Sequence, residues 1–236
     1  MRFRLEWLVV VVVTATAACG SEGKKTSAEP ARADGAAATD SRTAATPPRR
    51  QIVFMGTSLT AGLGLEPEQA FPALIGQRID SLGLSYGVRN AGVSGETSAG
   101  ALRRIGWVLH DTIDVLVLET GANDGLRGLG TSAMTANIQS ILDSVTRAKP
   151  QASVFLAEMN APPNMGARYT AAFHQAFVDL SKKNGVTLIP FLLAGVAGIP
   201  ALNQPDGIHP NVRGEEIVAE NVWRVLAPAL STQRVR

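Results

Sequence analysis

Residues 114–118 have the sequence Asp-Val-Leu-Val-Leu, and this short apolar run is the clearest buried strand in the chain. An apolar run without polar alternation is typical of a strand that is covered on both faces, as in a parallel sheet. Four further segments are predicted to be strands, at residues 51–55, 86–90, 152–156 and 186–189. We therefore expect five strands in one sheet.

Segments with the apolar spacing of helices separate and follow these strands. They lie at residues 66–82, 99–109, 131–148, 167–183 and 211–230. Strand and helix thus alternate along the chain, and right-handed crossovers between parallel strands place helices on both faces of a sheet. The predicted fold class is α/β, a three-layer α/β/α doubly wound sandwich with a five-stranded parallel sheet.

The bulk composition is that of a globular protein and excludes several kinds of site. The chain has 236 residues, of which 45% are hydrophobic and 18% charged, and its formal net charge is +2. That balance gives no indication of a nucleic-acid partner. One cysteine excludes a disulfide within the chain and a cysteine-based metal site, and three histidines argue against a histidine cluster. We expect no metal and no cofactor.

The N-terminus has the pattern of an export signal. Arg2 and Arg4 give a positive start, residues 8–13 are apolar, and residues 14–18 are small. The apolar run is shorter than the ~20 residues that a membrane-spanning helix needs. Residues 1–18 are therefore predicted to be a removable signal peptide.

The end of this signal suggests a lipid anchor. Residues 16–19, Thr-Ala-Ala-Cys, resemble the lipobox of bacterial lipoproteins, although Thr16 replaces the usual branched apolar residue. The resemblance implies that Cys19 becomes the lipidated first residue. The alternative is an ordinary signal peptide with a chance cysteine at its end. With lipidation, the protein is expected on the periplasmic or cell-surface face of a bacterial membrane, and its oligomeric state stays open.

The sequence divides into an anchor, a tether and a single domain. Residues 20–50 contain no aromatic residue and no Ile, Leu or Val, so they cannot bury enough apolar surface to fold. We expect the lipidated cysteine and a flexible tether over residues 19–50, the folded domain over 51–231, and a short tail at 232–236.

A serine follows the first predicted strand in a glycine-rich turn, Gly56-Thr57-Ser58-Leu59-Thr60-Ala61-Gly62. A serine in such a turn lies beside backbone N–H groups, which can stabilise an oxyanion. Two other interpretations are a phosphate-binding turn and a helix cap formed by Ser58. The segment lacks the G-x-x-x-x-G-K spacing of a P-loop, and Thr60 replaces the second glycine of a G-x-S-x-G elbow.

Three more polar segments follow later strands or precede the last helix, at residues 90–95, 121–124 and 206–210. Each alone has a plain interpretation, because Gly92 and Asn123 suit tight turns and Asp206 suits a helix cap. Sites in parallel sheets lie at the carboxyl ends of the strands, where these segments are expected to meet. Together they supply a nucleophile, a histidine base in His209, a carboxylate and oxyanion donors, in the order Ser, Asp, His.

These four segments resemble, in order, the conserved blocks of the SGNH or GDSL hydrolases, over nearly the whole predicted domain. The resemblance implies a flavodoxin-like sheet. It also implies that Ser58 is the nucleophile, that His209 is the base, and that Asp206 orients the base. The implied oxyanion hole consists of the Ser58 amide, the Gly92 amide and the Asn123 side chain.

Longer stretches resemble the arylesterase and lysophospholipase/acyl-CoA thioesterase branch, at residues 90–97, 121–128 and 200–210. This resemblance implies a serine esterase that cleaves carboxylic esters or thioesters of small or lipid-like substrates through an acyl-enzyme. Thr57 departs from the pattern, since the family usually has Asp before the serine. We expect the reaction type to survive this change, with rate and pH profile left open.

Candidate substrate-binding residues lie in two places. Leu126 and Arg127 follow the Asn123 segment and are expected at the rim of the site. The apolar segment at residues 191–200 precedes the catalytic loop, and it suits an acyl groove and a buried core segment equally. If it forms the groove, Ile199 and Pro200 contact the substrate.

Two other functions fit the same sequence. One is a carbohydrate deacetylase of the cell envelope, which the apolar 191–200 segment disfavours. The other is a non-catalytic binding lipoprotein, which the complete set of site residues disfavours.

Overall fold

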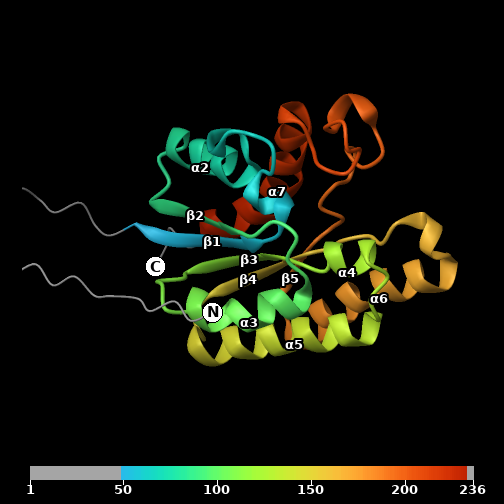
Figure 1. The fold of residues 1–236 in the computed structure, drawn as a ribbon. Helices are drawn as coiled ribbons and strands as arrows, with labels where there is room; N and C mark the ends of the chain where they lie inside the picture. Colours follow the sequence, from blue (N-terminus) through green and yellow to red (C-terminus); the bar gives the residue numbers. More distant parts are fainter. Residues whose placement is uncertain (1–48, 233–236) are drawn as a thin grey trace, which may run out of the picture. The chain divides into compact units, whose positions relative to one another are not determined.

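The computed structural model describes residues 49–232, and it contains one five-stranded sheet in the order β2-β1-β3-β4-β5 (Figure 1). All neighbouring strands pair in parallel. The strands are β1 Arg50–Gly56, β2 Tyr86–Gly92, β3 Val115–Glu119, β4 Ser153–Ala157 and β5 Thr187–Ile189. The predicted fold class is therefore confirmed. The expected signal peptide, Cys19 and nearly all of the tether lie outside the described residues.

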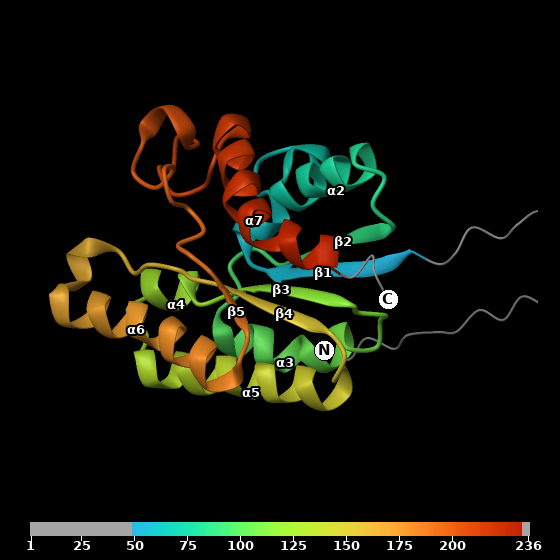
Figure 2. The ribbon, with the colours of Figure 1, turned by 180° about the vertical axis from the view of Figure 1, so that it is seen from behind.

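Helices cover both faces of the sheet, which gives three layers. Figures 1 and 2 show α2 and α7 on one face and α3, α5 and α6 on the other. The α-helices are α1 Ser58–Ala61, α2 Phe71–Ser81, α3 Ser98–Val108, α4 Ala122–Leu126, α5 Thr131–Ala148, α6 Ala167–Asn184 and α7 Val212–Thr232. Short 3₁₀ turns are η1 Pro67–Gln69, η2 Pro163–Met165 and η3 Pro200–Leu202. No helix within residues 49–232 is long and apolar enough to cross a membrane.

The helix boundaries differ from the prediction by more than two residues at one place. The helix expected over residues 66–82 is split into η1 and α2, and α2 begins at Phe71. Pro72 lies in the first turn of α2, where a residue without a backbone N–H costs no intrahelical hydrogen bond. The short helices α1 and α4 were not predicted, because four or five residues are too few to show helical periodicity.

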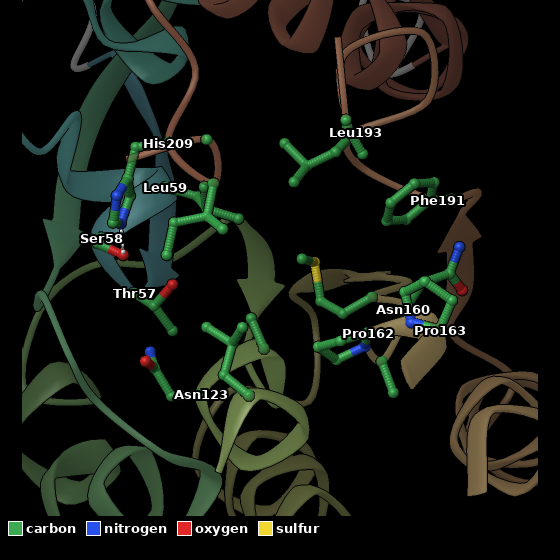
Figure 3. Close-up of a pocket in the computed structure, with 18 of the residues that line it drawn as sticks. Thr57, Ser58, Leu59, Asn123, Asn160, Pro162, Pro163, Phe191, Leu193 and His209 are labelled. Carbon is green, nitrogen blue, oxygen red and sulfur yellow. Dashed lines mark hydrogen bonds between the residues drawn. The ribbon is translucent and has the colours of Figure 1, made fainter. Parts of the chain in front are cut away.

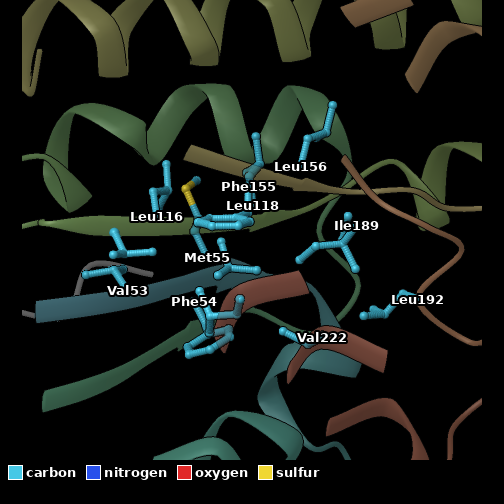
Figure 4. Packing of buried hydrophobic residues seen from close by; sticks show 14 of the residues in the cluster. Val53, Phe54, Met55, Leu116, Leu118, Phe155, Leu156, Ile189, Leu192 and Val222 are labelled. Atoms are coloured by element: carbon cyan, nitrogen blue, oxygen red, sulfur yellow. The ribbon is translucent and has the colours of Figure 1, made fainter. Parts of the chain in front are cut away.

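The core lies on both sides of the three inner strands, β1, β3 and β4 (Figure 4). The side chains of β1 from Ile52 to Met55 are at most 1% exposed. On one face, the Phe54 ring packs edge-on against Phe71 of α2, with 5.6 Å between the ring centroids. Complete burial of such a side chain is worth roughly 1.5–3 kcal/mol. The continuous apolar run of β1 follows from this covering of both faces.

The order of the strands determines where in the fold the site lies. The chain leaves β1 toward β2 on one side, and then crosses to β3 on the other side. Loops that follow strands on opposite sides of such a switch point separate and leave a crevice at the carboxyl ends. Ser58 follows β1 directly, Gly92 ends β2, and Asn123 lies four residues after the end of β3.

Candidate active site

A buried carboxyl group holds the turn that carries the serine. Glu119, the last residue of β3, accepts a hydrogen bond from the Thr57 backbone N–H at 2.6 Å. The Thr57 hydroxyl lies 2.9 Å from both carboxyl oxygens of Glu119, and the Thr60 hydroxyl lies 3.0 Å from one of them. A Cβ at Gly56 would stand 2.6 Å from that carboxyl, so only glycine fits there. Thr57 therefore fixes the backbone immediately before Ser58.

A second buried carboxyl lies behind the first. Glu215 of α7 is 1% exposed and accepts a hydrogen bond of 2.7 Å from the Phe71 N–H at the start of α2. Burial raises the pKa of Glu215 to about 8, and the neighbouring Glu119 contributes in the same direction. Burial also raises the pKa of Glu119, against the hydrogen bonds from Thr57 and Thr60. Burial thus disfavours the ionised form of both neighbouring carboxyl groups.

Ser58, His209 and Asp206 form one hydrogen-bonded chain (Figure 3). The Ser58 hydroxyl lies 2.9 Å from Nε2 of His209, and Nδ1 of His209 lies 2.6 Å from Asp206 Oδ2. Ser58 is 7% exposed, whereas the Asp206 side chain is 46% exposed. The hydrogen bond from His209 is the largest cause that lowers the pKa of Asp206, to about 2. This geometry suits an imidazole that takes a proton from Ser58 while an ionised Asp206 holds its other nitrogen.

The three-residue spacing of Asp206 and His209 has a structural reason. Asp206 Oδ1 accepts hydrogen bonds from the backbone N–H groups of Ile208, at 3.0 Å, and His209, at 3.1 Å. The same carboxylate thereby shapes the loop and orients the imidazole. The Gln204 side chain donates to the Leu63 carbonyl at 2.7 Å, which ties this loop to the end of the serine turn.

Of the residues expected to form the oxyanion hole, Ser58 and Asn123 lie at the cavity, whereas Gly92 does not. Asn123 and Ser58 line one cavity, and the Ser58 N–H begins α1, where it has no intrahelical partner. Gly92 does not line this cavity, and its N–H donates instead to the Asn90 side-chain oxygen at 2.9 Å. Within the predicted segment at residues 90–95, the glycine that lines the cavity is Gly95, whose φ is +76°. The structure therefore corrects the expectation for Gly92.

The cavity beside the serine has a volume of about 920 Å³. Figure 3 shows Ser58 and His209 on one side of it, and Phe191 and Leu193 across from them. Its apolar lining comes mainly from Leu59, Leu63, Leu126, Met159, Ala161, Pro162, Pro163, Phe191, Leu193, Ala197 and Ile208. Among the described residues that line it, none is Lys, Arg, Asp or Glu.

The predicted substrate-binding residues divide into two groups. Leu126 lines the cavity, whereas Arg127, Ile199 and Pro200 do not, and Arg127 donates to the Gly95 carbonyl at 3.0 Å. Both interpretations of the segment at residues 191–200 hold in part: Phe191, Leu193, Ala197 and Gly198 line the cavity, whereas Leu192 and Val196 are buried in the core.

Several lining residues were not among the predicted site residues. Residues 159–163, after β4, form one wall of the cavity. Prolines at 162 and 163 mark this segment as a loop, and its position after a strand is the one signal that could have placed it at the site. Within residues 49–232, no cluster of His, Cys, Asp and Glu could hold a metal ion.

The chain was compared with known proteins. Residues 54–217 match the GDSL-like lipase/acylhydrolase family. The esterase TesA of Pseudomonas aeruginosa is 38% identical over 180 residues, which are 76% of this chain and 89% of that protein. The thioesterase 1/protease 1/lysophospholipase L1 of Escherichia coli K12 is 35% identical over 76% of this chain and 85% of its own.

Solved structures share the same fold. The crystal structure of the psychrotrophic esterase EstA from Pseudoalteromonas sp., inhibited by monoethylphosphonate, superposes with a TM-score of 0.73. The sequences are 31% identical, and the match covers 77% of this chain and 99% of that one.

Proposed function

The chain belongs to the GDSL-like lipase/acylhydrolase family and is a serine esterase, and from this premise we propose that Ser58, His209 and Asp206 carry out the hydrolysis. The observation that supports these roles is the hydrogen-bonded chain from Ser58 Oγ through the His209 ring to Asp206, with distances of 2.9 and 2.6 Å. Serine is a weak nucleophile unless an adjacent base removes its proton, and this arrangement supplies that base.

The reaction follows from the geometry in two steps. His209 Nε2 takes the Ser58 proton while Oγ attacks the ester carbonyl, and His209 then gives this proton to the departing alcohol, which leaves an acyl-enzyme. His209 next takes a proton from water, which attacks the acyl group, and the proton returns to Ser58 as the acid leaves. We assign the oxyanion to the Ser58 amide, the Gly95 amide and Asn123, because Gly95 borders the cavity and its N–H bonds to no described group.

The preferred substrate is an uncharged acyl ester with a chain of medium length. The cavity of about 920 Å³ has the size of a small-molecule site, and its walls are mainly apolar. A sugar would leave its hydroxyl groups without partners against such walls, which is costly. This supports acyl esters, including lipid-like ones, over acetylated carbohydrates.

A series of p-nitrophenyl esters from two to twelve carbons tests this assignment. We expect kcat/KM to be highest at a medium chain length and to exceed that for acetylated sugars. Leu193→Trp fills the cavity across from Ser58, so it should lower kcat/KM for medium chains by about tenfold and leave the acetyl ester nearly unchanged. The exposed Leu82, changed to Trp, serves as the control. Greater activity on acetylated sugars than on acyl esters would contradict the proposal.

We also propose that the esterase is exported and held on a membrane through Cys19. The support is the sequence alone: a short signal-like segment ends at the single cysteine of the chain, before a tether-like composition. More than one acyl chain is needed for stable anchoring, and lipoprotein processing supplies them. Cys19→Ser should move the esterase activity from the membrane to the soluble fraction of expressing bacteria. Unchanged membrane association of that variant would exclude the anchor.

A further inference from the structure

We propose that Arg104 is a positioning residue for the oxyanion side of the site, acting through Glu96 on Asn123. Arg104 lies on α3 and does not line the cavity. The inference rests on the proposed function, because it assigns Arg104 a role in holding a proposed oxyanion donor.

Arg104 and Glu96 form a bidentate ion pair that is largely shielded from solvent. The Nε atom of Arg104 lies 2.7 Å and 2.9 Å from the two carboxylate oxygens of Glu96, and one terminal guanidinium nitrogen lies 2.8 Å from Glu96 Oε2. The side chains are 18% and 8% exposed. Two parallel charge-assisted hydrogen bonds fix the relative orientation of both groups, which a single contact does not.

The same guanidinium also contacts the nucleophile side of the site. Its terminal nitrogen donates to the Gly56 carbonyl at 3.2 Å, at the end of β1 and two residues before Ser58. Arg104 thus connects three segments: α3, the loop that contains Gly95 and Glu96, and the turn that carries the serine.

The backbone carbonyl of Glu96 in turn holds the Asn123 side chain. The Glu96 carbonyl accepts a hydrogen bond of 3.0 Å from Asn123 Nδ2. That nitrogen has two N–H groups, so one is fixed on Glu96 and the second remains for the cavity that Asn123 lines. Because the contact fixes which end of the amide is the nitrogen, it keeps the donor rather than the oxygen available to an oxyanion.

The loop is built around this arrangement. A Cβ at Gly100 would stand 2.7 Å from Glu96 Cγ, so glycine on α3 leaves the space in which the Glu96 side chain folds back to Arg104. Two residues further on, where α3 begins, Asp124 accepts hydrogen bonds from the Ser98 backbone N–H at 2.8 Å and hydroxyl at 2.6 Å. Two contacts therefore fix the α3 side of the loop that holds Gly95, and Arg104 makes one of them.

Loss of Arg104 should affect turnover more than binding. Without the guanidinium, the shielded Glu96 carboxylate has no counter-charge and moves toward water, and the loop moves with it. An oxyanion donor acts on the transition state rather than on the bound ester, so kcat falls while KM changes little. For Arg104→Gln we expect a decrease in kcat of about 10- to 100-fold, below the ~10²–10³ that loss of a whole donor costs. The neighbouring exposed Arg103, changed to Gln, is the matched control and should leave kcat unchanged.

A double-mutant cycle distinguishes this role from general destabilisation. Asn123→Ala alone should lower kcat by about 10²–10³. If Arg104 acts through Asn123, adding Arg104→Gln to that variant should lower kcat by a smaller factor than the same change does in the unmodified enzyme, and the remaining loss reflects Gly95 on the same loop. Equal effects of Arg104→Gln in both backgrounds would overturn the inference. Arg104→Lys, which keeps the charge but not the bidentate geometry, should recover only part of kcat.

Two further measurements distinguish failure of the proposed function, failure of the positioning role and loss of folding. Titration of Ser58 with a fluorophosphonate counts folded sites, and where Arg104→Gln does not fold, Glu96→Gln tests the same contact with a side chain of the same shape. If Ser58→Ala retains full activity, the proposed function fails. If Ser58→Ala is inactive but Arg104→Gln and Arg103→Gln both match the unmodified enzyme, the positioning role alone fails.

Discussion

Ser58→Ala should lower kcat for p-nitrophenyl esters by about 10⁶-fold, which is the scale reached when the nucleophile of a serine triad is removed. The hydroxyl that lies 2.9 Å from His209 Nε2 is the atom that attacks the ester. Alanine leaves the oxyanion donors and the cavity in place, so the residual rate measures what they supply without an acyl-enzyme. Purified enzyme and initial rates at saturating ester give the comparison.

Labelling by a fluorophosphonate probe is the second readout for this variant. The unmodified esterase should react at Ser58, and mass spectrometry of the labelled peptide should place the adduct there. Ser144→Ala, on α5 and outside the cavity, should retain both labelling and activity. Full esterase activity in purified Ser58→Ala would refute the assignment of the nucleophile.

Asp206→Asn should lower kcat on the order of 10⁴-fold, the effect known for the equivalent change in a serine triad. Asparagine can keep its oxygen on the Ile208 and His209 amides, so the loop should stay folded. Its NH₂ group then faces His209 Nδ1 and favours the tautomer with the proton on Nε2. That tautomer cannot accept the proton of Ser58.

The pH dependence of kcat distinguishes the wrong His209 tautomer in Asp206→Asn from the mere loss of a negative charge. Because hydrogen bonding to His209 lowers the pKa of Asp206 to about 2, its carboxylate is ionised from pH 4 upward, and its titration should not shape the activity profile of the unmodified enzyme. We expect the loss in Asp206→Asn at every pH between about 5 and 9. A loss of less than tenfold throughout that range would be inconsistent with an orienting role.

The sequence was sufficient to predict the layers and the strand positions. Residues 115–118 and 52–55 are apolar throughout, and this pattern has few explanations other than strands covered on both faces. The start of α2 was misplaced, because Phe71 and its neighbours have helical spacing but Pro72 restricts where the helix begins. The helical spacing of apolar residues alone therefore does not show where this helix begins.

The site was predictable where chemistry limits the choice of residue. Ser58, Asp206 and His209 were identified from their types and order, and the structure brings them into contact. The glycine proposed to stabilise the oxyanion was not identified from the sequence. Gly92 and Gly95 lie in one short segment, and the sequence does not show which of their backbone N–H groups is already hydrogen-bonded. The hydrogen bond from the Gly92 N–H to the Asn90 side chain distinguishes the two glycines. The Asn90 side chain is itself held by a hydrogen bond to the Thr60 carbonyl, a long-range contact that the sequence does not show.

Ser58 and His209, joined by a hydrogen bond, are 151 residues apart in the chain. A ribosome makes the nucleophile early and the base near the end, with four of the five strands between them. A nascent or truncated chain that stops before residue 209 therefore contains a serine without a base to activate it. Contacts between residues so far apart in the chain also slow folding, because closing the long intervening loop costs entropy. Hydrolysis through this pair is thus restricted to chains that extend at least to His209.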